Sequence, residues 1–468
     1  MLRPLCHAGK NVRIKRAFLA AFLLVGMALG QQPQPSEPQQ QPAEQTEHRI
    51  SPEEADKLFK AVDEILKFAS ERTGLPIKHP VKRKLTSRAE VEQFFLKAFK
   101  EDESAQRLQQ AELVLKKFGL IPRDSSLGGT LLALYTESVA GYYDPKTKTV
   151  YLLDWLDVES QKPVLAHELT HALQDQNFDL QKYFKQAKPK NGEYDVTTSE
   201  SLSARVAVME GQAAATMIDY LLEPRGLTLA SSPDIARAVQ SGMLSESEAP
   251  IFGHAPLYLR EDLKFPYTYG LNFVLSLMKK STSEAFTTPF KNPPATTRQI
   301  MEPETYEEGE AVPPLPVPDL DKVLGKEWQR FDVDCVGQFD VLVLAQEYGR
   351  TAEQARRLAT SWRNSYYYAA GKRGVKPSKT EDIGLLYVSK WSSAEAANHF
   401  ADVYAGAVGI RYKNIAPVEN EPGHWKSEEG DIFIERQGDY VLITESFPPE
   451  ISKKVRSAAL ERLQLPKQ

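Results

Sequence analysis

Prolines crowd one part of this 468-residue chain and divide it into two regions. They run from Pro293 to Pro318 and culminate in the stretch VPPLPVPD. Proline fixes φ and cannot donate a backbone hydrogen bond, so such a stretch interrupts helices and strands and is typical of a connection between folded units. The chain is also too long for one small core. We therefore expect two domains, at 51–310 and 331–468, joined by a proline-rich linker at 311–330.

The region before the prolines has mainly helical patterns. The letters SPEE at 51–54 match a capping box with proline at the first helical position. Apolar residues follow at helical spacing to about residue 72, and two more helical stretches lie between residue 86 and residue 119. Residues 51–120 are thus predicted to form a helical N-terminal part. A further helix is expected at 200–222.

Strands are predicted in two places. The segment 142–153 contains two aromatic and β-branched runs around DPKT, which is typical of a hairpin. After the prolines, residues 331–468 alternate helical stretches with short strands at 383–388, 432–435 and 440–443. The expected fold class is α+β, with a mainly helical first domain followed by a smaller α+β domain.

The first fifty residues differ in kind from the rest. Four basic residues at 10–16 precede an apolar run at 17–29 that ends in small residues. This order is typical of a secretory signal, and the run is too short to span a membrane comfortably. We predict a signal peptide at 1–30 and a disordered Gln/Pro-rich tether at 31–50. The protein is then exported, to the periplasm or outside the cell, without a membrane span; an uncleaved N-terminal anchor is the alternative.

Charge and cysteine content narrow the chemistry. The formal net charge is -5, and no cluster of basic residues interleaves with aromatic ones, so no nucleic-acid partner is expected. Cys6 lies inside the predicted signal peptide, which leaves Cys335 alone. Neither a disulfide nor a cysteine-ligated metal site is then possible. Any metal must be bound by His, Asp or Glu side chains.

Two histidines stand four residues apart in the motif HELTH at 167–171. On a helix, His167 and His171 share one face, so both can bind a single zinc ion at about 2.0–2.1 Å. Glu168 points to the side, toward a metal-bound water, as a general base does. Pro163 is predicted in the first turn of this helix, whose apolar residues lie opposite the histidines. The alternative is that the histidines occupy a solvated helix face.

A catalytic zinc needs a third protein ligand. Asn177 stands where the common third histidine would be, so the ligand must be acidic. Within the predicted helix at 200–222, Glu210 lies on an apolar face of small residues. A buried carboxylate there is costly unless it meets a cation, so Glu210 is the predicted third ligand. The alternative is a buried salt bridge from Glu210 to a Lys or Arg.

Other residues near the motif are weaker candidates. Glu200, Asp195 and Asp175 are less favoured as the third ligand, and Asp175 and Gln174 are alternatively expected to orient a ligand imidazole. The edge of the hairpin at 142–153 is either a site for strand addition by an extended peptide or purely structural.

Several motifs together resemble a known family. AGYYDP, LAHELTHALQDQNFDL, MEGQA, FPYTYG and NPPATTRQIMEPETY are similar to those of poorly characterised exported bacterial proteins regarded as zinc metallopeptidases of the gluzincin type, with HExxH plus a downstream Glu. The resemblance covers residues about 125 to 306. It implies a zincin-like domain in which His167, His171 and Glu210 bind Zn²⁺ and Glu168 is the base.

The resemblance also suggests further residues and shows two departures. Gluzincins use a Tyr or His to stabilise the oxyanion, which makes Tyr267, Tyr269 and His254 candidates by position. Gln212 stands where the family often has an acidic residue two positions after the ligand. Glu302 precedes a proline where the family often has a histidine. Neither departure affects the expected zinc ligands.

The sequence therefore predicts zinc-dependent hydrolysis of peptide bonds in a peptide or protein substrate. Glu168 takes a proton from the zinc-activated water and passes it to the leaving amine. The alternative is an exported binding or envelope-assembly protein with a structural zinc or an inactive peptidase site. A further possibility is that residues 51–120 form an inhibitory segment.

Overall fold

A computed structural model describes residues 49–465 of the protein, except 101, 186–195, 233, 235–237 and 239–249. The predicted signal peptide at 1–30, and the predicted tether as far as residue 48, lie outside the described residues. The described part combines helices with two sheets, so the predicted α+β fold class is confirmed.

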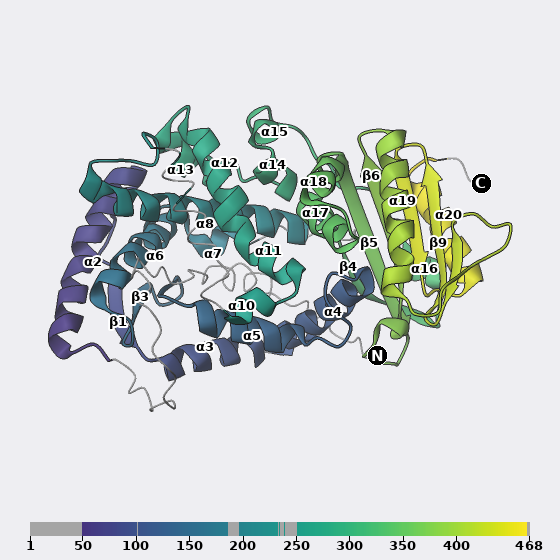
Figure 1. Ribbon diagram of the computed structural model, residues 1–468, viewed down its shortest axis with the longest axis horizontal. Helices are drawn as coiled ribbons and strands as arrows, with labels where there is room; N and C mark the ends of the chain where they lie inside the picture. Colours follow the sequence, from purple (N-terminus) through teal and green to yellow (C-terminus); the bar gives the residue numbers. More distant parts are fainter. Residues whose placement is uncertain are drawn as a thin grey trace, which may run out of the picture.

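The first region is built mostly of helices, with a small sheet beside α2 and α6 (Figure 1). Its strands are β1 (Lys82–Thr86), β2 (Tyr142–Asp144) and β3 (Thr149–Leu153), in the order β1-β3-β2. Strand β1 runs parallel to β3 and β2 antiparallel to it. Its helices are α2 (Pro52–Thr73), α3 (Arg88–Lys100), α4 (Asp102–Phe118), α5 (Leu127–Ser138), α6 (Val158–Phe178), α7 (Leu180–Tyr183), α8 (Thr198–Leu222), η1 (Glu223–Arg225), α10 (Pro250–His254), α11 (Leu257–Phe265), the π-helical turn η2 (Pro266–Gly270), α12 (Leu271–Met278), α13 (Thr282–Lys291), α14 (Thr297–Met301) and α15 (Pro303–Glu307).

Helix α2 supports the helix that carries HELTH. Its capping box is formed by Ser51 and Glu54, as predicted, and Gly74 ends it with φ 70°. The buried face of α2 packs against the apolar face of α6, with Leu58, Val62 and Leu165 in one cluster. Because α2 and β1 belong to this core, we favour a structural role for them over an inhibitory one.

Helix α6 begins earlier than the sequence suggested. The side chain of Asp157 accepts a hydrogen bond from the backbone N–H of Ser160 at 3.0 Å and caps the helix, which starts at Val158. Pro163 therefore lies inside the helix and not in its first turn, and that prediction was wrong. The missing N–H of Pro163 would bond the carbonyl of Glu159, which lies in the exposed first turn of the helix, before the continuously buried stretch that begins at Leu165.

The second region contains a fully antiparallel sheet in the order β4-β5-β6-β10-β9-β8-β7. Helices cover both of its faces: along β5, Tyr366 and Tyr368 pack with α16 and α20, whereas Tyr367 packs with the cluster of α17, α18 and α19. The elements are α16 (Leu320–Leu324), β4 (Trp328–Asp334), α17 (Gln338–Glu347), α18 (Ala352–Thr360), β5 (Trp362–Lys372), η3 (Thr380–Asp382), β6 (Ile383–Trp391), α19 (Ala394–Arg411), β7 (Ala416–Pro417), β8 (His424–Ser427), β9 (Gly430–Gln437), β10 (Tyr440–Glu445) and α20 (Pro449–Arg462).

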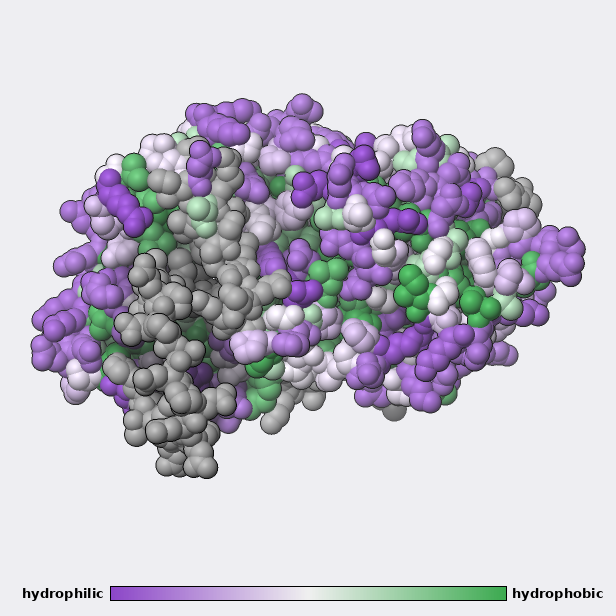
Figure 2. Space-filling view, viewed as in Figure 1, coloured by the Kyte–Doolittle hydropathy of each residue, from purple (hydrophilic) through white to green (hydrophobic). Residues whose placement is uncertain are grey.

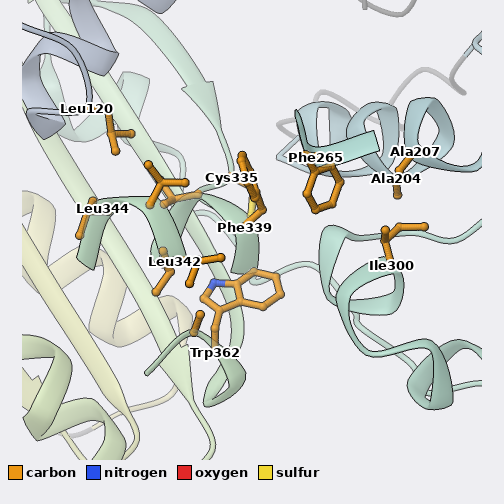
Figure 3. Packing of buried hydrophobic residues seen from close by; sticks show 14 of the residues in the cluster. Leu120, Ala204, Ala207, Phe265, Ile300, Cys335, Phe339, Leu342, Leu344 and Trp362 are labelled. Atoms are coloured by element: carbon orange, nitrogen blue, oxygen red, sulfur yellow. The ribbon is translucent and has the colours of Figure 1, made fainter. Parts of the chain in front are cut away.

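The two regions share an apolar core at their junction. Figure 3 shows Phe265 of the first region facing Phe339 of α17, with Ala204 on the far side of Phe265. At the end of α4, the ring of Phe118 lies 5.4 Å from that of Tyr387. Helix α16 and the first residues of β4 lie in the range 311–330, which the prolines predicted as a linker. Ordered structure therefore occupies part of that range.

The face of the molecule drawn in Figure 2 carries mostly polar side chains where residues are described, and hydrophobic ones appear in small groups. None of the described helices combines the length and the apolar character that crossing a bilayer requires.

Candidate metal centre

Helices α6 and α8 bring three predicted ligands together. Nε2 of His167 lies 3.0 Å from Oε2 of Glu210 and 3.0 Å from Nε2 of His171, and Nε2 of His171 lies 3.5 Å from the same carboxylate oxygen. All three side chains are buried. The histidines are thus not on a solvated helix face, and the apolar side of α6 lies against α2.

The spacing of these atoms fits a metal ion. Tetrahedral zinc with bonds of about 2.0–2.1 Å holds neighbouring ligand atoms roughly 3.3 Å apart. The three measured separations, 3.0, 3.0 and 3.5 Å, lie around that value. Oε1 of Glu210 is also buried without a hydrogen-bond partner among the described residues. Two imidazoles and a carboxylate are a donor set that zinc prefers, so the residues present fit the ion.

Glu168 stands beside this triangle of atoms. His167, Glu168 and His171 each offer a ligand atom within 4.8 Å of the others. The Oε2 atom of Glu168 accepts a hydrogen bond from the backbone N–H of Tyr143 at 2.8 Å. Since Glu210 lies closer to the imidazole nitrogens and Glu168 is held from β2, the geometry favours Glu210 as the third ligand.

Tyr143 connects the small sheet to α6 at two points. Besides its N–H bond to Glu168, its hydroxyl donates to Oδ2 of Asp175 at 2.7 Å, where Lys148 also binds at 2.6 Å. Asp175 is therefore occupied by Tyr143 and Lys148 and does not orient a histidine. The edge of β2 is also partly used, because the N–H of Tyr143 is not available to an added peptide strand. The sequence predicted the hairpin at 142–153 next to HELTH, but it did not single out Tyr143 as the residue that bonds Glu168.

A close approach of α8 and η2 positions Tyr267. A Cβ on Gly211 would lie 2.4 Å from the carbonyl carbon of Gly270, so the two glycines let the backbones touch. The π-helical turn η2 then places the hydroxyl of Tyr267 3.0 Å from Oε2 of Glu210.

The other two oxyanion candidates lie elsewhere. Tyr269 packs against Phe265 at 5.5 Å between ring centroids, and His254 is exposed, with Nδ1 2.7 Å from the carbonyl oxygen of Pro250. Of the three, the structure brings Tyr267 to the cluster.

Gln174 contacts the imidazole of His171, one of the predicted ligands. Its Oε1 lies 2.9 Å from Nδ1 of His171, and its amide nitrogen donates to Oε1 of Gln212 at 3.0 Å. Gln212, which departs from the family pattern, is thus buried and hydrogen-bonded beside the site. Sequence reasoning assigned it no role, because its helix face is opposite that of Glu210 and only tertiary structure shows what meets it.

The remaining candidates for the third ligand are not at the centre. Glu200 accepts hydrogen bonds from the N–H and hydroxyl of Thr297 at 2.9 Å. Asp195 lies outside the described residues. Within the described part of the chain, the ion-pair partners of Glu210 are the two histidines and not a Lys or Arg.

The burial of the cluster shifts its protonation equilibria. Burial raises the pKa of Glu168 to about 8. Burial lowers the pKa of His171, but Glu210 outweighs this effect and brings it to about 9. Burial likewise opposes ionisation of Glu210, yet the positive charge of His171 and the hydrogen bond from His167 hold its pKa at about 2. The buried Glu210 carboxylate is therefore ionised and requires a positive charge beside it.

Comparisons with protein-family models, with curated proteins and with solved structures return no significant match. The resemblance to gluzincin-type metallopeptidases therefore stays a prediction from the sequence, and the function must be argued from the site itself.

Proposed function

We propose that the protein is an exported zinc-dependent hydrolase of peptide bonds. The observation that carries this proposal is the triangle formed by Nε2 of His167, Nε2 of His171 and Oε2 of Glu210, with sides of 3.0, 3.0 and 3.5 Å and a second carboxylate, Glu168, alongside. A catalytic zinc site usually has three protein ligands and an open position, whereas a structural site has four ligands. In sites built on HExxH, the glutamate beside the first histidine is the general base.

Each residue has a distinct part in this proposal. His167, His171 and Glu210 hold the metal, and a bound zinc ion would polarise the peptide carbonyl and acidify water. Glu168 takes the proton of the water that attacks the carbonyl carbon, and gives it to the amine nitrogen as the carbon–nitrogen bond breaks. The backbone N–H of Tyr143 holds Oε2 of Glu168, which leaves Oε1 to accept the proton.

Glu168 must be ionised to act as a base. Its burial raises its pKa to about 8, which favours the protonated form at neutral pH. A cation held by the three neighbouring ligands would favour the carboxylate form. Tyr267 donates its hydroxyl hydrogen to Glu210, so we assign it to holding this ligand and not to the oxyanion.

A second candidate function is a structural zinc in an exported binding or envelope-assembly protein. The observation in its favour is the burial of His167, Glu168, His171 and Glu210, none of which exceeds 2 % exposure. Hydrolysis requires that a substrate reach the cluster, whereas a structural metal needs no access.

The decisive experiment compares Glu168→Gln with wild type on a broad peptide library, after metal analysis of both proteins. We expect both to contain zinc and Glu168→Gln to lose about 10²–10⁴-fold in rate. Glu159→Gln is the matched control, because Glu159 lies on the same helix with a largely exposed side chain. Equal cleavage by wild type and Glu168→Gln would refute the mechanism, and zinc without cleavage of any peptide would favour the structural role.

The ligand assignment is tested separately with His167→Ala and Glu210→Ala. Each should lower the zinc content of the purified protein, because each removes one of three ligands. Unchanged zinc content in both variants would show that the metal site lies elsewhere, whereas unchanged zinc content in Glu210→Ala alone would show that Glu168 substitutes for Glu210.

A further inference from the structure

Two buried glutamines connect His171 to the backbone of neighbouring helices. Oε1 of Gln174 lies 2.9 Å from Nδ1 of His171. Nε2 of Gln174 donates to Oε1 of Gln212 at 3.0 Å and to the carbonyl of Met209 at 3.0 Å. Nε2 of Gln212 donates to the carbonyl of Ala285 at 2.8 Å. We call this chain of hydrogen bonds the Gln174–Gln212 relay; it joins α6, α8 and α13.

The direction of the relay follows from its two backbone ends. A carbonyl oxygen only accepts hydrogen bonds, so the amino group of Gln212 must face Ala285 and the amino group of Gln174 must face Met209. The oxygen of Gln212 then meets the amino group of Gln174, and the oxygen of Gln174 is left for His171. Nδ1 of His171 must therefore carry a hydrogen.

The consequence for His171 concerns its other nitrogen. A histidine that binds a metal is neutral, and with the hydrogen on Nδ1 its lone pair lies on Nε2. This Nε2 is the atom 3.0 Å from Nε2 of His167 and 3.5 Å from Oε2 of Glu210. The Gln174–Gln212 relay thus determines which nitrogen of His171 can bind a metal and in which direction that nitrogen points.

We propose that the Gln174–Gln212 relay fixes His171 as the Nδ1–H tautomer and orients its Nε2 toward the metal, so that Gln174 and Gln212 are positioning residues of this site. The inference rests on the metal-binding part of the proposed function and is independent of peptide hydrolysis.

Two comparisons within the site support a specific role for the relay. Nδ1 of His167 has no hydrogen-bond partner among the described residues, so the relay acts on one ligand and not on both. The carboxylate next to Gln174 in the chain, Asp175, is engaged by Tyr143 and Lys148 and leaves His171 to the amide.

The relay is also uncharged. Both glutamines are completely buried, and a carboxylate in either place would add a further negative charge to a site that already holds Glu168 and Glu210. An amide relay orients the imidazole without this charge. Substituting it therefore alters the position of His171 and not the net charge of the site.

The test measures metal binding in Gln174→Leu and Gln212→Leu, with zinc affinity taken from competition with a chelating dye and ligand geometry from the absorption spectrum of the Co²⁺-loaded protein. Loss of a partner that orients a metal ligand typically costs about 10–100-fold in metal affinity. We expect a loss of this size and shifted Co²⁺ bands for Gln174→Leu, and a smaller loss for Gln212→Leu. Thr216→Val is the matched control: it is buried on α8 one turn from Gln212, its hydroxyl bonds within its own helix, and its affinity should equal wild type.

Nitrogen-15 NMR of zinc-loaded wild type labelled at histidine provides a measurement that needs no variant. We expect a hydrogen on Nδ1 of His171 and the metal on Nε2. Zinc affinities of both glutamine variants equal to wild type, or Nδ1 of His171 without a hydrogen, would overturn the proposal. If wild type binds no zinc, the metal site and the relay fail together; if His167→Ala abolishes binding while both glutamine variants bind normally, only the relay fails.

Discussion

The contact of Gly211 with Gly270 makes Gly211→Ala a severe substitution at a position where alanine would ordinarily help a helix. The new Cβ would lie 2.4 Å from both the carbonyl carbon and oxygen of Gly270 and 2.8 Å from the nitrogen of Leu271. All three are backbone atoms, so no side chain can rotate away. Ordinary contact begins at 3.4 Å, so α8 and η2 must separate by at least 1.0 Å.

The loss in the free energy of unfolding caused by this separation can be calculated from three contributions. Overpacking of a core typically costs about 1–3 kcal/mol. The hydroxyl of Tyr267, now 3.0 Å from Glu210, would move to about 4 Å and lose its hydrogen bond, which costs about 1–3 kcal/mol more for a buried group. Alanine recovers about 1 kcal/mol in helix propensity. We expect a net loss of about 1–5 kcal/mol in the free energy of unfolding.

Urea unfolding of metal-free protein, followed by tryptophan fluorescence and circular dichroism, measures this loss. Gly406→Ala is the matched control, because Gly406 lies exposed in α19 with nothing within 4 Å of a new Cβ. It should stabilise the protein by about 0.5–1 kcal/mol. If Gly211→Ala unfolds at the same urea concentration as Gly406→Ala, the close approach of α8 and η2 is incorrect.

Three further substitutions or treatments have defined outcomes. Burial, and then Asp340, raise the pKa of Glu200 to about 8 from an ordinary 4.5, so the folded protein binds one more proton than the unfolded chain between these values. Stability should fall as pH rises from 4.5 to 8, by up to about 1.4 kcal/mol per pH unit, and Glu200→Gln should remove this slope in urea unfolding at pH 5 and pH 8. Glu445→Ala leaves the buried guanidinium of Arg411 without its carboxylate partner at 2.8 Å and should lower the free energy of unfolding by about 3–5 kcal/mol; an unchanged urea midpoint would contradict the buried pair. Removal of zinc with a chelator should lower the unfolding free energy, by about 4 kcal/mol when free zinc had exceeded its dissociation constant a thousandfold, and should have no effect on His167→Ala.

The sequence predicted elements whose signals are local. The helix expected from 52 to about 72 is α2, at Pro52–Thr73, because its capping box and apolar spacing lie within the helix itself. The hairpin and the helix of Glu210 were recognised for the same reason. The two histidines and Glu210 could be proposed because helical spacing determines which side chains share a face.

Contacts between segments far apart in the chain could not be predicted from the sequence. Strand β1, with the letters KRKLT, has no alternating pattern and is a strand because β3 pairs with it in parallel. The N–H bond from Tyr143 to Glu168 and the amide bond from Gln174 to Gln212 depend on how β2 and α8 pack on α6. Asp157 was a local signal that the prediction overlooked, and its cap moved the start of α6 five residues before Pro163.

The attachment of α4 to the second region determines when this protein can complete its core during synthesis. The carbonyl of Phe118 accepts a hydrogen bond from the hydroxyl of Tyr348, 230 residues later, and the ammonium of Lys117 pairs with Glu429, 312 residues later. Helix α4 therefore emerges from the ribosome long before Tyr348 and Glu429 are synthesised. Until then the ring of Phe118 and the ammonium of Lys117, both buried in the folded protein, are exposed to water. We therefore expect the N-terminal segment to remain incomplete until the second region is made, and a chain cut at the prolines to leave these groups of α4 exposed to water.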